Sequence, residues 1–204
     1  MIDRVGDKVV GVILECGYMP EAKLIEANDK RNRFSMAPRC IEDSPTPWTN
    51  CNFKFAMVRE LKDQVPGIKV GVRGISNLDD ALKAADFGAS AIWLTEKVHS
   101  RSAMSPISLI HNIGEALANL HPGVEVFMQG GVRRGTDILK SVALGAKAVF
   151  LDLDTVLWGL VRDGNSQGLA DMLTMLNEEL KLAMVLTHSE DIPAVKASRI
   201  IHWI

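Results

Sequence analysis

The chain has 204 residues, and its 23 Lys and Arg against 25 Asp and Glu give a formal net charge of −2 with neutral histidines. This balance argues against nucleic-acid-binding proteins and polybasic membrane-surface proteins, because both carry a basic excess. Hydrophobic residues make up 47% of the chain, which argues against intrinsic disorder, and no apolar run reaches the roughly 18 residues of a membrane-spanning helix. We therefore expect a single domain over residues 1–204, with neither a nucleic-acid nor a membrane partner. Cysteines and histidines show no metal-ligand spacing, so no metal site is expected.

The first third of the chain is only partly regular. A β-branched apolar run predicts a strand over residues 9–14. Residues 15–50 are polar and proline-rich, which is typical of a long loop, and such loops in compact domains usually carry function or are disordered. Phe55, Val58 and Leu61 then recur at helical spacing, which predicts a helix that ends before Pro66.

From residue 68 onward, predicted strands and helices alternate. Strands are predicted over residues 68–72, 91–94, 124–128 and 148–151. Helices are expected after the capping residues 76–80, over 107–120, over 138–144 behind a cap at Thr136 and Asp137, and along an apolar face over 169–183. Strands that are apolar on both faces indicate a parallel sheet covered by helices. Periodicity leaves two α/β architectures open, a (β/α)₈ barrel and an open doubly wound sheet.

The sharpest chemistry lies in a glycine-rich turn that follows the strand predicted over 124–128. Gly130 and Gly131 let backbone N–H groups approach a ligand, and Arg133 and Arg134 bring charged donors to a helix N-terminus, which favours an anion. These residues indicate a phosphate site, although a plain strand-to-helix turn with two solvated arginines explains them equally well. The pattern is not G-x-G-x-x-G, so a nicotinamide site of the Rossmann type is unsupported.

Residues 124–150, VEVFMQGGVRRGTDILKSVALGAKAVF, closely resemble the FMN-dependent 2-hydroxy-acid oxidase family, which includes the glycolate and lactate oxidases. Similar segments follow the family's order at residues 31–38, 72–75 and 178–184. The resemblance implies a (β/α)₈ barrel with FMN at the C-terminal ends of the strands. Five strands are recognisable where closure needs eight, so we expect a partial barrel whose N-terminal strands are missing and whose open edges favour association.

The resemblance also implies which residues hold the cofactor. In the family, backbone glycines and the first arginine of the turn hold the FMN phosphate, and Gly130, Gly131 and Arg133 match them, with Arg134 beside them. A basic family residue near flavin N1 corresponds to Arg73. Gln129 stands where the family has an aspartate, so a carboxylate of the family site is absent.

Two departures from the family pattern predict weak activity. After the last strand the family has a glycine and an arginine that complete the phosphate cradle, but here Asp152, Leu153 and Asp154 bring like charge toward a phosphate. In the catalytic loop, Lys97 falls at the family's base histidine and Ser100 at its substrate-binding arginine. A serine cannot pair bidentately with a carboxylate, and a lysine is a base only where its surroundings favour the neutral form.

We therefore predict an FMN-dependent (S)-2-hydroxy-acid oxidase family member with impaired catalysis. The alternatives are a non-catalytic scaffold or interaction remnant, and a partial chain of an active oxidase. If the protein is active, the resemblance implies a small 2-hydroxy acid as its substrate, and association into a homo-oligomer is left open. The cytoplasm is the default location. A peroxisomal location rests on the family alone, because the C-terminal residues 201–204 do not resemble the S-K-L signal.

Overall fold

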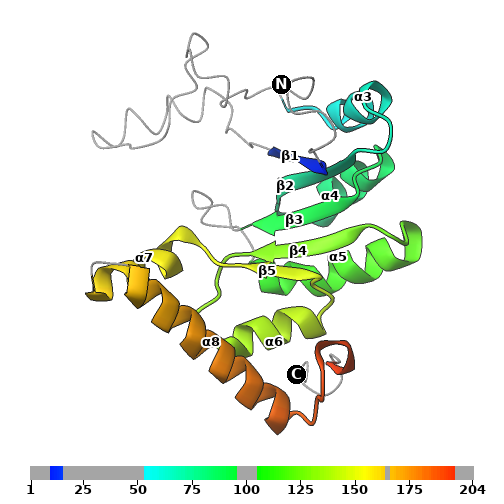
Figure 1. The fold of residues 1–204 in the computed structure, drawn as a ribbon. Helices are drawn as coiled ribbons and strands as arrows, with labels where there is room; N and C mark the ends of the chain where they lie inside the picture. The colour runs from blue at the N-terminus through cyan, green and yellow to red at the C-terminus, as the bar shows by residue number, and fades with distance from the viewer. Residues whose placement is uncertain (1–9, 16–52, 96–104, 164–165, 196–204) are drawn as a thin grey trace, which may run out of the picture.

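The computed structural model describes residues 10–15, 53–95, 105–163 and 166–195 (Figure 1). Its strands are β1 (Gly11–Glu15), β2 (Lys69–Ile75), β3 (Ala91–Thr95), β4 (Glu125–Gln129) and β5 (Ala148–Phe150). Its helices are α3 (Ala56–Gln64), α4 (Leu78–Asp86), α5 (Pro106–Leu120), α6 (Gly135–Ala143), α7 (Leu153–Asp163) and α8 (Ser166–Leu186), with a 3₁₀ turn at Ile192–Ala194.

The five strands form one parallel sheet in the order in which they occur along the chain. Parallel neighbours need a crossover connection, and α4, α5 and α6 each lie between two consecutive strands in the sequence. A doubly wound sheet reverses its strand order at a switch point, whereas the described strands run in one direction without a reversal. The topology therefore favours part of a barrel, and it confirms the predicted α/β class.

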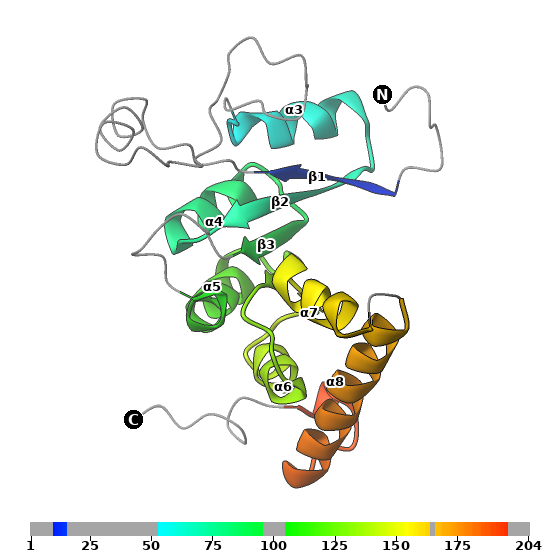
Figure 2. The same cartoon turned by 90° about the vertical axis from the view of Figure 1, so that its left-hand side faces the viewer.

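The two faces of the sheet differ in what covers them. Helices α4, α5 and α6 lie together along one side of the strands (Figure 2). The side chains that face these helices form the core and are at most 5% exposed: Val70, Val72, Ile92, Leu94, Val126 and Met128. The residues between them in each strand are only half-buried, among them Arg73, Trp93 and Phe127. We call this second surface the inner face, because it would line the interior of a closed barrel.

Helix α8 packs against α6 at a point of very close backbone approach. A Cβ atom added to Gly135, the first residue of α6, would lie 2.6 Å from the carbonyl oxygen of Leu176 and would also collide with the backbone nitrogen of Leu180. Only glycine allows the two helices to meet at this distance. This contact fixes α8 next to the turn between β4 and α6.

Most predicted elements are confirmed, with two corrections. Helix α6 begins at Gly135, three residues before the predicted start, and its N-cap is Arg134 rather than Thr136 or Asp137. Helix α7 was not predicted, because the acidic residues after β5 were considered only for their charge near a phosphate. The loop predicted over residues 15–50 lies outside the described residues except for Glu15, which ends β1. In the part of the chain that the structure describes, no helix is long and apolar enough to cross a membrane.

Candidate functional site

The turn from β4 to α6 has the backbone that its glycines predict. Gly130 and Gly131 have φ angles of 110° and 71°, in the left-handed region that side-chain-bearing residues rarely adopt. A Cβ atom on Gly131 would meet nothing within 4 Å, so conformation rather than crowding requires glycine there. The turn consequently presents a series of backbone N–H donors at the C-terminal edge of the sheet.

Carboxylates already accept hydrogen bonds from the donors nearest to helix α6. The Oδ2 atom of Asp137 accepts from the backbone nitrogens of Arg133 at 3.1 Å and Arg134 at 3.0 Å. The Oε2 atom of Glu179, on α8, accepts from the nitrogen of Gly135 at 2.8 Å. Acidic groups suit this position because the first N–H groups of a helix lack intrahelical partners and carry partial positive charge. The helix N-terminus is thus capped from within the protein.

A third carboxylate reaches the glycine half of the turn. Asp152, which directly precedes α7, accepts a hydrogen bond through Oδ2 from the backbone nitrogen of Gly131 at 3.2 Å. Thr155, on the first turn of α7, donates from its hydroxyl group to the carbonyl oxygen of Val132 at 3.0 Å. The start of α7 is therefore hydrogen-bonded to the turn at two points. The carboxylate of Asp152 already occupies the Gly131 N–H group, which an anionic ligand would need.

The two arginines of the turn have different surroundings. Arg134 lies 3.7 Å from Glu179 between Nη1 and Oε1, and its side chain is largely exposed. Arg133 lines an open groove between α7 and α8, together with Asp154 and Trp158. The turn therefore offers backbone donors, while its two cations lie beside the neighbouring helices.

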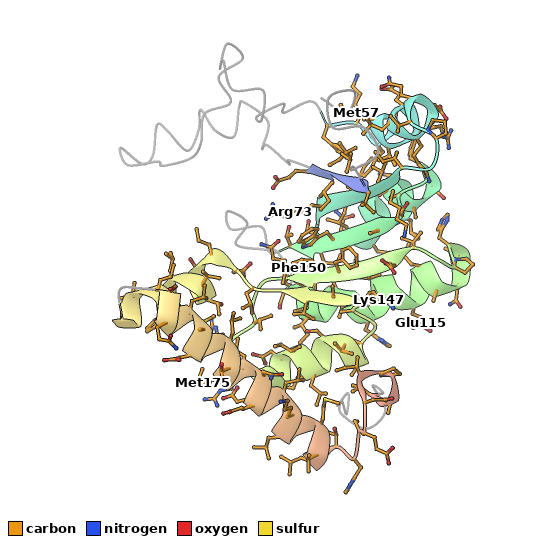
Figure 3. The ribbon with its side chains drawn as sticks, in the orientation of Figure 1. Met57, Arg73, Glu115, Lys147, Phe150 and Met175 are labelled. Atoms are coloured by element: carbon orange, nitrogen blue, oxygen red, sulfur yellow. The ribbon has the colours of Figure 1, made fainter. Side chains whose placement is uncertain are left out.

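Arg73 lies near the C-terminal end of β2 on the inner face (Figure 3). Its Nη1 atom is 3.7 Å from the carboxylate of Glu15, and its guanidinium carbon is 5.6 Å from the centroid of the Trp93 ring. The Nε atom of Arg73 and the Nε1 atom of Trp93 are both buried, and neither has an acceptor among the described residues. Two neighbouring strands therefore bring two unpaired donors to the same part of the inner face, where Arg73 and Trp93 are register partners.

An aromatic cluster continues the inner face toward β5. Trp93 stacks on Phe150 with 4.1 Å between ring centroids, and it meets Phe127 edge to face at 6.0 Å. The three rings come from β3, β4 and the end of β5, so the cluster spans neighbouring strands. Offset and edge-to-face pairs of this kind stabilise a structure beyond their buried area by about 0.5–1.5 kcal/mol each. The three rings make this part of the inner face apolar, and the Arg73 guanidinium lies next to them.

Comparison with known proteins identifies the family. The family model for FMN-dependent dehydrogenases matches residues 18–202. The chain belongs to the FMN-dependent dehydrogenase family. The predicted resemblance to FMN-dependent 2-hydroxy-acid oxidases is thereby confirmed.

Curated members of this family are longer than the chain. Human 2-hydroxyacid oxidase 1 is 36% identical over 217 aligned positions, which cover 95% of this chain and 56% of that protein. An L-lactate oxidase from Nostoc sp. is 37% identical over 115 positions, which cover 56% of this chain and 31% of that protein. The chain thus spans about a third to just over half of the length of the relatives it matches.

Solved structures of the family share the fold. A mandelate oxidase carrying a monooxide FMN adduct has a TM-score of 0.62 and 31% identity, covering 71% of this chain and 45% of that one. A mandelate oxidase variant with (S)-mandelic acid has a TM-score of 0.68 and 26% identity, covering 96% of this chain and 56% of that one. These likenesses place the five-stranded sheet within the architecture of FMN-dependent dehydrogenases.

The structure brings together most of the site residues that the family resemblance predicts. Gln129 ends β4 and is the register partner of Thr95, which ends β3, so both residues lie at the C-terminal edge of the sheet. Gly130 and Gly131 follow directly on that edge, and Arg73 approaches it from β2. Lys97 and Ser100 lie outside the described residues, so their roles stay predictions.

The described residues fit FMN only in part. Positive-φ glycines and the buried, unpaired Nε atom of Arg73 suit a flavin mononucleotide, which presents a phosphate and ring acceptors. The phosphate half does not fit, because the carboxylate of Asp152 already accepts from Gly131 and would face the phosphate with like charge. Asp152 thus contacts the glycine turn directly, while its effect on FMN stays a prediction. Among the described residues, no cluster of three or more His, Cys, Asp or Glu could hold a metal ion.

Two functional candidates were missed by sequence reasoning. Trp93 was interpreted only as a strand residue, although alternation along β3 places it on the same face as Thr95 at the C-terminal edge. Glu179 was interpreted as part of a late helix, and no local pattern links it to Gly135, 44 positions earlier in the chain. Trp93 could have been found by counting alternate positions along the strand from its C-terminal end. Glu179 could be found only from the tertiary fold.

Proposed function

We propose that this chain is an FMN-dependent 2-hydroxy-acid oxidase family member that, by itself, binds FMN weakly and oxidises 2-hydroxy acids poorly. The relatives named above, which include 2-hydroxyacid, lactate and mandelate oxidases, support the reaction class and a small 2-hydroxy acid as the substrate class. The single observation that carries the proposed impairment is the hydrogen bond from Gly131 to Asp152. Lys97 and Ser100, in place of the family's base and carboxylate-binding arginine, support it from the sequence.

Electrostatics sets the size of the expected effect. Two unit charges of the same sign about 4 Å apart repel by roughly 1 kcal/mol in water and about 4 kcal/mol at an effective dielectric constant of 20. Asp152 is half-buried just before α7, so we expect its repulsion of a phosphate to lie between these two energies. A repulsion of this size weakens binding from several-fold to several-hundred-fold. The same carboxylate also occupies the Gly131 donor, so a phosphate has to displace it before it can bind.

The test is a titration of FMN with the purified chain, followed by quenching of flavin fluorescence. Asp152→Asn keeps the size of the side chain and removes its charge, and we expect it to tighten FMN binding by about tenfold. Asp63→Asn is the control: it removes an exposed carboxylate at the end of α3, away from the turn between β4 and α6. We expect this control to leave the affinity for FMN nearly unchanged.

Two results would contradict the proposal. The first is wild-type protein that purifies with flavin absorption bands near one FMN per chain. The second is release of hydrogen peroxide with glycolate or lactate at rates typical of enzymes, about 1–1,000 per second, and its loss in Lys97→Ala. The first result would show that the altered cradle still holds FMN, and the second that the altered loop still supports an oxidase.

A further inference from the structure

The turn between β4 and α6 is rich in negative charge where a phosphate would need donors. Three carboxylates accept hydrogen bonds from its backbone nitrogens: those of Asp137, Asp152 and Glu179. The two cations of the turn are Arg133 and Arg134, and Arg134 already lies 3.7 Å from Glu179. Three anions against two cations oppose a ligand group that is itself anionic. The same arrangement favours a neutral group that can donate a hydrogen bond.

Asp152 can accept a second hydrogen bond without releasing Gly131. Its Oδ2 atom accepts from the Gly131 nitrogen at 3.2 Å, whereas an ionised carboxylate has two oxygens with about four lone-pair sites. A hydroxyl group donates as well as accepts, so a ligand hydroxyl can bind this carboxylate and leave the turn intact. A phosphate ester at pH 7 carries a charge of about −1.5 to −2 and mainly accepts, so it competes with Asp152 for the same donor.

The inner face offers the opposite chemistry, because it has donors that lack acceptors. The Nε atom of Arg73 and the Nε1 atom of Trp93 are buried, and the described residues give neither of them an acceptor. A buried donor without a partner is costly, so a ligand that supplies acceptors here is stabilised. Trp93 also stacks on Phe150, which makes the surroundings aromatic. An aromatic ring system with carbonyl oxygens and ring nitrogens, such as the flavin ring, matches both properties.

We propose that this site selects riboflavin, the flavin that lacks a phosphate, over FMN. Arg73 and Trp93 donate to the acceptors of the flavin ring, and Asp152 accepts from the terminal hydroxyl group of the ribityl chain. The inference rests on the proposed function, which makes a flavin the ligand of this site, and it adds which form of flavin the turn accepts. Riboflavin and FMN share the ring and the ribityl chain, so a difference in their affinities reports on the turn alone.

The first experiment titrates the purified full chain with riboflavin and, separately, with FMN, and follows the quenching of flavin fluorescence. We expect the wild type to bind riboflavin at least about tenfold more tightly than FMN, because Asp152 repels only the phosphate. Asp152→Asn should bring the two dissociation constants to within about threefold of each other, mainly by tightening the binding of FMN. Asp63→Asn, which removes an exposed carboxylate at the end of α3, should keep the preference for riboflavin.

The second experiment separates the two halves of the site without a substitution in the turn. Added salt screens the repulsion of a phosphate and leaves a neutral ligand almost unaffected, so the preference for riboflavin should narrow as the salt concentration rises from about 0.01 M to about 1 M. Trp93→Phe keeps an aromatic ring and removes the indole N–H group. This variant should weaken the binding of both flavins by the same factor, about threefold to tenfold, because the ring is common to them.

Three outcomes would overturn the inference. One is a wild-type chain that binds the two flavins equally weakly, which would remove the selection and leave the proposed weak binding of FMN in place. Another is a preference for riboflavin that persists in Asp152→Asn, which would assign the selection to a different group. The third is tighter binding of FMN than of riboflavin by the wild type. If that FMN also copurifies near one per chain, the proposed function fails together with the inference.

Discussion

The guanidinium carbon of Arg73 lies 5.6 Å from the centroid of the Trp93 ring, across two neighbouring strands of the inner face. The cation faces the negative side of the indole, and Glu15 approaches the same guanidinium from β1 at 3.7 Å. Trp93 in turn stacks on Phe150, so a single arginine links the edge strand β1 to the aromatic cluster. The inner face is therefore stabilised by the ion pair of Arg73 with Glu15 and by several aromatic rings.

We predict a measurable coupling between Arg73 and Trp93. A double-mutant cycle with Arg73→Ala and Trp93→Leu should give about 0.5–1 kcal/mol in the free energy of unfolding, because the pair is only half-buried. Arg59, over the ring of Phe87 at 5.2 Å, provides a reference cycle on the helical side of the sheet. Urea unfolding measures both cycles, and coupling in the reference but none at Arg73 would contradict the assignment.

The close approach of α6 and α8 predicts a large loss of stability when Gly135 is replaced. Gly135→Ala should destabilise the fold by about 3 kcal/mol or more, because the new methyl group collides with the backbone of α8 and the helices must separate. Gly114→Ala, inside α5, is the matched control, since a Cβ atom there would lie 3.4 Å from the Leu144 carbonyl oxygen. Thermal unfolding should show Gly114→Ala to be neutral or slightly stabilising. Equal effects at the two sites would refute this description of the helix contact.

Glu179, on α8, should stabilise the fold by capping the N-terminus of α6. Its carboxylate accepts from Gly135 and approaches Arg134, so Glu179→Ala should lower the free energy of unfolding by about 1–2 kcal/mol. Glu178 is an exposed neighbour on α8, and Glu178→Ala should change stability by less than about 0.5 kcal/mol. Chemical denaturation of the two variants side by side is the measurement, and a larger loss at Glu178 would be inconsistent with the capping role.

The N-caps of α4 and α5 give a second matched pair. Asn77 accepts through Oδ1 from the backbone nitrogen of Asp80 at 2.8 Å, whereas Ser105 precedes α5 without a side-chain capping bond. Asn77→Ala should therefore lower stability by about 1 kcal/mol, and Ser105→Ala should have almost no effect. Circular dichroism during thermal unfolding detects the difference, and the reverse order of the two effects would contradict it.

The repeating part of the fold could be predicted from the sequence because its signals are local. The strands from β2 to β5 are short β-branched or aromatic runs, and Asn77 and Pro106 mark helix starts by their own chemistry. Helix α7 was missed because Asp152 and Asp154 were considered only as charges near a phosphate, yet acidic side chains are favourable in the first turn of a helix. The start of helix α6 was predicted too late because arginine is not a usual N-cap residue, although Asp137, at N3, accepts from the Arg134 nitrogen.

The candidate site was predictable only where it follows the family motif. The motif predicts Gly130, Gly131 and Asp152 as site residues, and the structure adds that Gly131 and Asp152 are hydrogen-bonded to each other. The contact of Glu179 with Gly135 joins residues 44 positions apart, and no spacing rule reaches that far. Which neighbour a strand residue such as Trp93 meets also depends on the register between strands, which the sequence alone does not specify.

The turn between β4 and α6 distributes four backbone donors among three acidic side chains from separate parts of the chain. Gly131 donates to Asp152, Arg133 and Arg134 donate to Asp137, and Gly135 donates to Glu179. We therefore expect each of these amides to exchange its hydrogen with solvent only when the hydrogen bond to its own acidic partner is broken. Hydrogen exchange at Gly131 would therefore report on the packing of α7, and exchange at Gly135 on the packing of α8. Comparing the two exchange rates shows which helix detaches from the turn more readily.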